Sequence, residues 1–274
     1  MTYRQLKAAL EPCAGPGEDA GFEALQLLTE YCGVSRASVL CEPDKDYSDA
    51  RLETAVKLRR QGEPLQYILG RWDFMGLPFR LTRDCLVPRA DTEILCQRLI
   101  ELLSPGDVFA DLCTGSGCIG VAALKLTEDT VCTAVEKYRE TLDIAGENAR
   151  MNGVESRFVP VLADALEDCL YDRGPFDVIV SNPPYISLKE MEDIPADVAA
   201  QPRRALTDEG DGLSFYKAML GYCPGHIRPG GRLLFEIGWK QAQAVGLLAK
   251  AEGFESSIIK DCDGRDRVCE IYIK

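Results

Sequence analysis

The sequence lacks any apolar run long enough to cross a bilayer, and it carries charge near its start, where an export signal requires an apolar stretch. A membrane-spanning helix needs about 20 consecutive apolar residues, and the core of a signal peptide is uncharged. Residues 1–7 include Arg4 and Lys7. We therefore expect a cytoplasmic protein without a membrane partner.

Histidine is also scarce, which argues against a metal centre. His226 is the only histidine, and none of the 12 cysteines forms a Cys-x-x-Cys pair. Structural zinc sites use closely spaced Cys and His ligands. Cys96 and Cys132 stand among apolar, periodic residues, where a reduced thiol packs as a small hydrophobe. We expect no metal, and we interpret His226 as a structural residue of a turn-rich loop.

Positive charge is the third scarce feature. The chain has 31 Lys and Arg against 44 Asp and Glu, a formal net charge of -13. Proteins that hold nucleic acids by their phosphates rely on clustered Lys and Arg. The balance argues against a direct nucleic-acid partner and favours a small molecule or a basic protein as the substrate.

Helical periodicity dominates the first quarter of the chain. Residues 6–70 predict a small helical domain, with breaks at Gly15-Pro16-Gly17 and at Glu42-Pro43-Asp44. Residues 72–87 predict a β-hairpin with Gly76 near its turn. A helix should then begin at Asp91 or Thr92, where an oxygen-bearing side chain can cap the first free amides.

Strands alternate with helices in the rest of the chain, which is typical of a parallel sheet covered on both faces. The two final strands, joined around Asp263-Gly264, predict an antiparallel edge. The fold class is therefore α/β, a doubly wound and mostly parallel sheet with a small N-terminal helical domain. We divide the chain into a helical domain (1–70), a hairpin linker (71–88) and an α/β domain (89–274). The predicted strands are 108–112, 131–135, 159–162, 178–180, 232–237, 256–260 and 268–273.

A glycine-rich loop follows the first of these strands and opens a helix. Gly115, Gly117 and Gly120 permit a tight turn and a close approach of a ligand to the backbone. Glu136 ends the next strand, where it could accept hydrogen bonds from a ribose. Taken alone, these features fit a dinucleotide as well as S-adenosylmethionine.

Two carboxylates favour S-adenosylmethionine. Asp111 lies at the strand end, where it would repel a pyrophosphate but attract the amino group of a methionine moiety. Asp164, after the third strand, is placed to meet an adenine edge. An ordinary role for Asp164 as a helix cap stays open.

The segment Asn182-Pro183-Pro184-Tyr185 directly follows a buried strand, at the sheet edge where ligands bind in such folds. The Asn182 side chain and the Pro183 carbonyl offer two acceptors, and Tyr185 offers a ring face. Two acceptors holding the N–H bonds of a planar NH2 group would aim its nitrogen at a methyl donor. The alternative is a turn with a packed tyrosine.

Several separated motifs together resemble the release factor glutamine methyltransferases of the PrmC/HemK type. The resemblance spans nearly the whole chain. Asn-Pro-Pro-Tyr alone is less specific, because methyltransferases of nucleic-acid amino groups share it. The motifs are residues 63–70, 87–93, the glycine loop, 182–185, 202–206, 211–213 and 235–238.

The resemblance implies a class I S-adenosylmethionine methyltransferase that methylates the side-chain amide of the glutamine in the Gly-Gly-Gln loop of peptide chain release factors. The helical domain would recognise that substrate. Together with the residues argued above, the cofactor set is Asp111, Cys113, Thr114, Gly115, Ser116, Gly117, Glu136, Asp164, Ala165 and Asn182. The substrate set is Arg89, Asn182, Pro183, Pro184 and Tyr185, of which Asn182, Pro183 and Tyr185 are the expected catalytic residues.

Some positions depart from the family's pattern. Cys113 replaces a common glycine, and Ala165 replaces an aromatic residue that often covers the adenine. The Arg203-Arg204 pair is either a solvated surface feature, which is the interpretation we favour, or a contact with the partner. The rival hypotheses are a nucleic-acid amino methyltransferase that uses the same loop on a flipped base, a dinucleotide-dependent oxidoreductase, and a binding module that keeps the fold without turnover.

Overall fold

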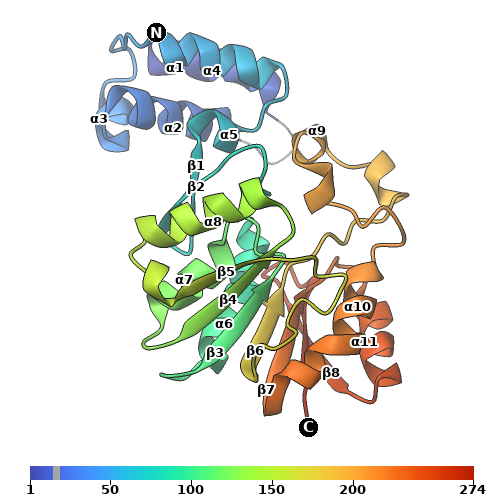
Figure 1. Ribbon diagram of the computed structural model, residues 1–274. Coiled ribbons are helices and arrows are strands. Elements are labelled where there is room, and N and C mark those ends of the chain that lie inside the picture. Colours follow the sequence, from blue (N-terminus) through green and yellow to red (C-terminus); the bar gives the residue numbers. More distant parts are fainter. Residues whose placement is uncertain (15–18) are drawn as a thin grey trace. The chain divides into compact units, whose positions relative to one another are not determined.

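The computed structural model describes residues 1–14 and 19–274, and these form two compact units. The first comprises residues Met1–Arg71 and Pro195–Gln201; the second comprises Trp72–Ile194 and Pro202–Lys274. The predicted break at Gly15-Pro16-Gly17 lies outside the described residues. Figure 1 labels the helices and strands.

The first unit is helical, as its periodicity predicts. Its core is built from leucines that recur on one face of each helix, such as Leu6, Leu27 and Leu52, all of them almost fully buried. A buried ion pair joins Arg59 to Glu23 at 2.7 Å. The helices are α1 (Tyr3–Leu10), α2 (Ala20–Cys32), α3 (Arg36–Cys41), α4 (Ala50–Arg60), α5 (Leu65–Leu69) and α9 (Ala196–Ala199).

The predicted hairpin is confirmed, with strands β1 (Arg71–Phe74) and β2 (Leu77–Arg80). Its two turn residues, Met75 and Gly76, have φ values of 52° and 72°. Positive φ at both central residues matches the right-handed twist of the flanking strands.

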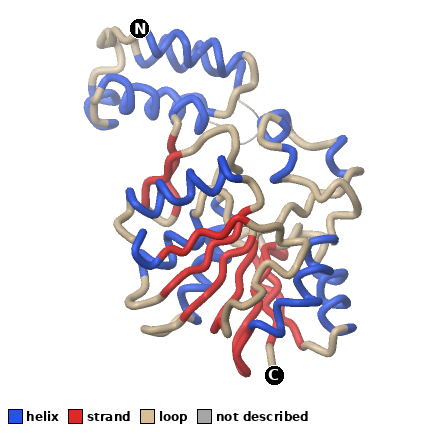
Figure 2. The backbone as a smooth tube through the Cα atoms, in the orientation of Figure 1, coloured by secondary structure: helices blue, strands red, loops and turns tan. Residues whose placement is uncertain are grey.

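A seven-stranded sheet forms the centre of the second unit, in the order β5-β4-β3-β6-β7-β9-β8. The first five strands in this order are parallel, and β9 is antiparallel to both β7 and β8. The doubly wound sheet and its antiparallel edge are therefore confirmed (Figure 2). The strands are β3 (Val108–Leu112), β4 (Val131–Glu136), β5 (Phe158–Leu162), β6 (Phe176–Ser181), β7 (Ile227–Glu236), β8 (Glu255–Lys260) and β9 (Asp266–Tyr272).

Helices cover both faces of this sheet (Figure 1). Successive strand residues alternate between two hydrophobic cores: Phe109 and Val180 belong to one, and Ala110 and Ile179 to the other. The first core packs on α6 (Ala90–Leu102), α7 (Cys118–Leu126) and α8 (Arg139–Met151), and the second on α10 (Ser214–Tyr222) and α11 (Ala242–Ala251). Short 3-10 helices occupy Glu11–Cys13, Glu155–Arg157, Glu190–Glu192, Arg203–Ala205 and Cys223–His226.

The start of α6 differs from the prediction. The helix begins at Ala90, its N-cap is Arg89, and no side chain caps it. Asp91 and Thr92 do not cap because both side chains have tertiary partners. Asp91 pairs with Arg267 at 2.9 Å, and the Thr92 hydroxyl accepts a hydrogen bond from the Asn182 side chain.

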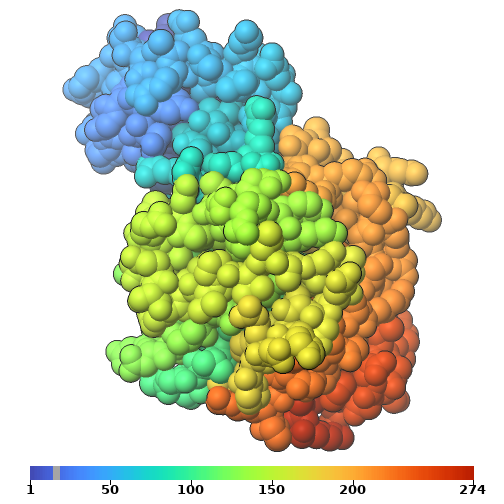
Figure 3. Space-filling model, in the orientation of Figure 1, coloured from blue at the N-terminus to red at the C-terminus, as the bar shows by residue number. Residues whose placement is uncertain are grey.

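The surface of the second unit brings distant parts of the sequence together. The green and yellow middle of the chain and its orange C-terminal part lie side by side on one face (Figure 3). None of the 12 cysteines, all of which lie within the described ranges, forms a disulfide. In the described part of the chain, no helix has both the length and the apolar character needed to span a membrane.

Candidate functional site

The glycine-rich loop leaves β3 with a left-handed backbone. Cys113, Gly115 and Gly117 have φ values of 58°, 58° and 80°. A Cβ on Gly117 would lie only 3.1 Å from the Cβ of Ala145, so glycine is required both for the conformation and for the close approach to α8. The Asn148 side chain of α8 donates to the Ser116 carbonyl at 2.8 Å. These contacts hold the loop against α8.

Asp111 lies on the side of this loop that faces away from the cavity. This position differs from our expectation that it contacts the amino group of a methionine moiety. Its side chain is 0% exposed and does not line the cavity described below. Its Oδ2 accepts hydrogen bonds from the Thr114 hydroxyl at 2.5 Å and the Gly120 amide at 3.1 Å. Burial raises the pKa of Asp111 to about 7. The carboxyl therefore anchors the loop from the side away from the cavity, through its hydrogen bonds with Thr114 and Gly120.

Glu136 ends the neighbouring strand β4 and faces the loop. Its two oxygens accept hydrogen bonds from the backbone amides of Gly115 and Tyr138, each at 3.1 Å. Burial raises the pKa of Glu136, and these amides oppose the rise. The carboxyl is still accessible from the cavity, where its remaining lone pairs can accept hydrogen bonds from a ligand.

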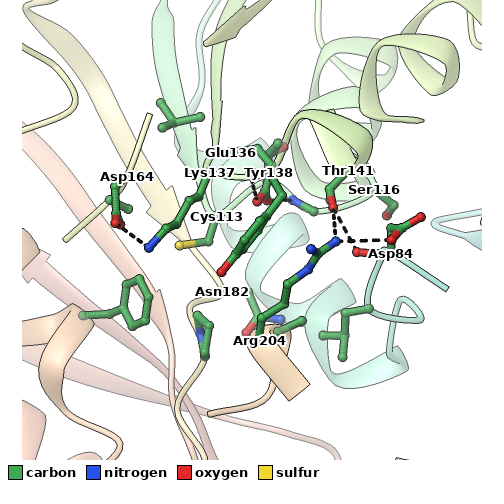
Figure 4. A pocket seen from close by; sticks show the side chains of 18 of the residues that line it. Asp84, Cys113, Ser116, Glu136, Lys137, Tyr138, Thr141, Asp164, Asn182 and Arg204 are labelled. Carbon is green, nitrogen blue, oxygen red and sulfur yellow. Dashed lines mark hydrogen bonds and ion pairs between the residues drawn. The ribbon is translucent and has the colours of Figure 1, made fainter. Parts of the chain in front are cut away.

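A cavity of about 540 Å³ opens at the carboxyl ends of β3, β4 and β6 (Figure 4). Its volume suits a nucleoside-sized ligand. The predicted site residues that line it are Cys113, Thr114, Gly115, Ser116, Glu136, Asp164, Ala165, Asn182 and Pro184. The predicted site residues outside its lining are Arg89, Asp111, Gly117, Pro183 and Tyr185.

Two cation-containing pairs at the cavity were missed in the sequence. The Lys137 ammonium pairs with Asp164 at 2.7 Å. The Arg204 guanidinium lies 4.0 Å from the centre of the Tyr138 ring and bonds to Glu140 at 2.8 Å. Figure 4 shows the Tyr138 ring between the Lys137 and Arg204 side chains.

The interpretation of Arg204 as a solvated surface residue is therefore wrong, because stacking and ion pairing fix its side chain in the cavity wall. Arg203, by contrast, forms an exposed ion pair with Glu209 and also contributes to the lining. The signal that could have found Tyr138 is its place two residues after Glu136, at the same strand end.

Asp164 does not cap a helix, because no helix lies between β5 and β6, a stretch that the structure describes in full. Its Oδ1 accepts a hydrogen bond from the Leu166 amide at 3.0 Å within a turn. Its Oδ2 pairs with Lys137, and the side chain lines the cavity. A ligand that approaches Asp164 therefore meets a charge-paired carboxylate.

Phe215 of α10 supplies an aromatic ring to the cavity. Tyr216 and Leu220 of the same helix are buried, whereas Phe215 is only partly buried and lines the cavity. Because Ala165 has no ring of its own, Phe215 and Tyr138 are the aromatic rings of the described lining residues.

Asn182 follows β6 and turns its amide into the cavity wall. Its Nδ2 donates to the Thr92 hydroxyl oxygen at 3.2 Å. The donor end of the amide is thus engaged with α6, which leaves Oδ1 as the end that can accept a hydrogen bond from a ligand. Asn182 is partly exposed and lines the cavity beside Thr114 and Gly115.

The rest of the Asn-Pro-Pro-Tyr loop is held from behind. The Tyr185 hydroxyl donates to Glu236 Oε1 at 3.1 Å, and the Gln241 side chain donates to the Tyr185 carbonyl at 2.9 Å. A Cβ on Gly212, whose φ is 78°, would lie 2.3 Å from that same carbonyl. Burial raises the pKa of Tyr185, and the nearby Arg267 and Arg89 charges oppose the rise.

The parallel sheet, the glycine loop beside an acidic strand end, and the adjacent Asn-Pro-Pro-Tyr loop define a class I methyltransferase, a fold whose enzymes in general use S-adenosylmethionine. Residues 90–232 match the Methyltransferase small domain, and residues 3–70 match the PrmC N-terminal domain. The chain belongs to the release factor glutamine methyltransferase family, which confirms the resemblance inferred from its motifs.

Two relatives align with this chain over almost their whole length. The release factor glutamine methyltransferase of Moorella thermoacetica is 36% identical, over 99% of this chain and 99% of that protein. The Bacillus subtilis protein of the same name is 37% identical, over 99% and 98%. A methyltransferase crystal structure from Pyrococcus furiosus is 21% identical and has a TM-score of 0.56 over 73% of this chain and 90% of that one; it is similar in fold.

Proposed function

We propose that this protein transfers a methyl group from S-adenosylmethionine to the side-chain amide nitrogen of the glutamine in the Gly-Gly-Gln loop of peptide chain release factors. The observation that carries the proposal is the Asn182 amide, whose oxygen is free to accept beside the glycine loop while its nitrogen is engaged with Thr92. The names of the relatives support the substrate.

The cavity lining fits S-adenosylmethionine. Glu136 can accept hydrogen bonds from ribose hydroxyls, and the apolar side formed by Ala165, Leu166 and Phe215 suits an adenine ring. The bound cofactor would supply an electrophilic methyl group on a sulfonium. We retain Asp111 as a cofactor residue through its hold on the loop at Thr114 and Gly120.

The Asn-Pro-Pro-Tyr loop suits a planar NH2 group. The lone pair of an amide nitrogen is delocalised, so the nitrogen is a weak nucleophile. In our proposal, Asn182 Oδ1 and the Pro183 carbonyl accept its two N–H bonds and aim the nitrogen at the methyl group, while Pro184 and Tyr185 bound the site. Such alignment contributes up to about 7–11 kcal/mol in well-oriented systems. As the N–C bond forms and the S–C bond breaks, the nitrogen becomes acidic and its proton passes to solvent, so no histidine base is needed.

The same proposal assigns a role to each part of the chain. Residues 1–70 would recognise the release factor, residues 71–88 would link the domains, and residues 89–274 would carry out the transfer. Arg89, which the resemblance assigns to the substrate side, directly precedes α6 as its N-cap residue. The acidic chain suits a release factor with a basic surface, because opposite charges favour encounter.

Mass spectrometry of a release factor tests the proposal directly. A bacterial release factor is incubated with the enzyme and S-adenosylmethionine, then digested and sequenced. We expect one added methyl group on the Gly-Gly-Gln glutamine, and none in a parallel reaction with NAD in place of the cofactor. If the release factor stays unmodified while RNA added to the same reaction is methylated, the result would favour the nucleic-acid alternative and contradict our assignment.

A further inference from the structure

The Asn182 amide is connected to groups behind the cavity that the proposed chemistry does not use. Thr92, on the first turn of α6, is 2% exposed, and its hydroxyl oxygen accepts from Asn182 Nδ2 at 3.2 Å. Glu236, at the end of β7, is also 2% exposed, and its Oε1 accepts from the Tyr185 hydroxyl at 3.1 Å. Two buried side chains from two other elements thus contact the two ends of one loop.

The Glu236 carboxyl also lies close to the Thr92 hydroxyl. Burial raises the pKa of the Glu236 carboxyl, and the hydroxyl of Thr92 and the charge of Arg267 oppose that rise. Glu236 Oε2 is buried and has no hydrogen-bond partner within the described chain. Thr92 is nevertheless close enough to affect the pKa of the Glu236 carboxyl. The remaining charged neighbour, Asp91, has its own ion pair with Arg267 at 2.9 Å.

The direction of these contacts decides what Asn182 presents to a substrate. A primary amide has a donor end and an acceptor end of nearly the same shape, and a rotation of half a turn exchanges them. A carboxylate only accepts hydrogen bonds, so a Thr92 hydroxyl turned toward Glu236 offers its lone pairs to the Asn182 NH2. The same carboxylate fixes the direction of the Tyr185 hydroxyl.

We propose that Thr92 and Glu236 are positioning residues that fix the polarity of the Asn182 amide, so that its oxygen and not its NH2 group meets the substrate amide. This inference rests on the proposed methyl transfer, because the polarity matters only if an NH2 group is the acceptor of the methyl. Without the Thr92 oxygen, the Asn182 NH2 loses its partner, and rotation would set it against the N–H bonds of the substrate.

The test compares Thr92→Val with Thr92→Ser. Valine keeps the shape and removes the oxygen, whereas serine keeps the oxygen and removes one methyl group. We expect Thr92→Val to lower kcat for release factor methylation by roughly 10-fold or more, with the Kd for S-adenosylmethionine within about twofold of the wild type. Thr92→Ser should retain most of the wild-type kcat, which a role in packing alone would not require.

Glu236→Gln provides a second variant in case Thr92→Val does not fold. Glutamine keeps the size but can turn an NH2 group toward Thr92 or Tyr185, so kcat should again fall while cofactor binding is retained. Thermal unfolding and cofactor titration of each variant establish that it is folded.

The outcomes separate the two proposals. A wild-type enzyme that does not methylate any release factor overturns the proposed function and this inference with it. A wild-type enzyme that is active, together with folded Thr92→Val and Glu236→Gln variants of normal kcat, overturns only the inference. A loss in both variants with rescue by Thr92→Ser supports it.

Discussion

The loops after β3 and β6 lie side by side at one sheet edge but are built differently. The loop after β3 depends on backbone: three of its residues, Cys113, Gly115 and Gly117, are left-handed, and the Gly115 amide donates to Glu136. The loop after β6 is held by side chains: Asn182 contacts Thr92, and Tyr185 contacts Glu236 and Gln241.

The difference follows from what each loop has to hold. A cofactor that is the same in every turnover can be held by backbone amides and a fixed acidic residue, so a rigid turn suffices. A substrate amide needs acceptors of a defined direction, and only side chains with partners behind them, as Asn182 has in Thr92, provide that direction. Mutations in the two loops should therefore separate cofactor binding from turnover.

The largest expected effect comes from Asn182→Ala, because it removes an acceptor aimed at the reacting nitrogen. Turnover should fall by on the order of 10²-fold or more, as when one positioned polar group is lost, while S-adenosylmethionine still binds. Steady-state kinetics and calorimetric titration measure the two quantities. Near-normal turnover would remove Asn182 from the mechanism.

Gly212→Ala should damage the same loop from behind. The added Cβ would lie 2.3 Å from the Tyr185 carbonyl, so that segment has to move. We expect a fall in kcat of about 10-fold, since small misplacements of aligned groups cost about this much or more. Cofactor affinity should stay close to that of the wild type. A variant that loses cofactor binding and keeps its kcat would show that the two loops are not separable.

Gly117→Ala should have the opposite signature. Its Cβ would contact Ala145 at 3.1 Å in a left-handed backbone, and we expect weaker cofactor binding together with a stability loss of about 1–3 kcal/mol. Gly253→Ala is the matched control. Gly253 has a φ of 86° but nothing within 4 Å of the added Cβ, so it reports the backbone strain without the clash. Equal losses in the two variants would argue against close packing at Gly117.

The smallest effect concerns the buried Asp111. Because its folded pKa is about 7 against an ordinary 3.8, the folded state binds this proton more tightly than the unfolded state. The stability from this group is complete below about pH 4 and is lost as pH rises through 7. Between pH 5 and 8 the wild type should lose on the order of 1–3 kcal/mol through it.

Asp111→Asn should flatten this dependence. Asp111 Oδ1 has no hydrogen-bond partner in the described chain, so asparagine can place its oxygen at the Oδ2 position and keep both contacts. Urea unfolding at the two pH values measures the difference. An identical slope in both proteins would mean that Asp111 is ionised throughout.

The sequence predicted the elements of the sheet well, because buried parallel strands have continuous apolar runs and end in recognisable loops. The hairpin turn at Gly76 and the antiparallel edge were predicted for similar local reasons. The start of α6 was not, since Thr92 and Asp91 are capping residues by type and have partners far away in sequence.

The candidate site shows the same contrast between features that the local sequence predicts and features that depend on the tertiary fold. Residues at strand ends, such as Glu136 and Asn182, were predicted from their place after an apolar run. Asp111 was placed on the wrong side of its loop, because a one-dimensional pattern does not say whether a carboxyl at a strand end points into or beneath the turn. Arg204 and Phe215 were missed because the tertiary fold alone brings them to the cavity.

The most direct measurement of the central claim is a crystal structure of the enzyme with S-adenosylhomocysteine and a release factor. We predict that the glutamine amide nitrogen lies between Asn182 Oδ1 and the Pro183 carbonyl, within hydrogen-bonding distance of both and facing the sulfur of the cofactor product. A glutamine bound away from these two oxygens, or an Asn182 amide that turns its NH2 group toward the substrate, would contradict the account.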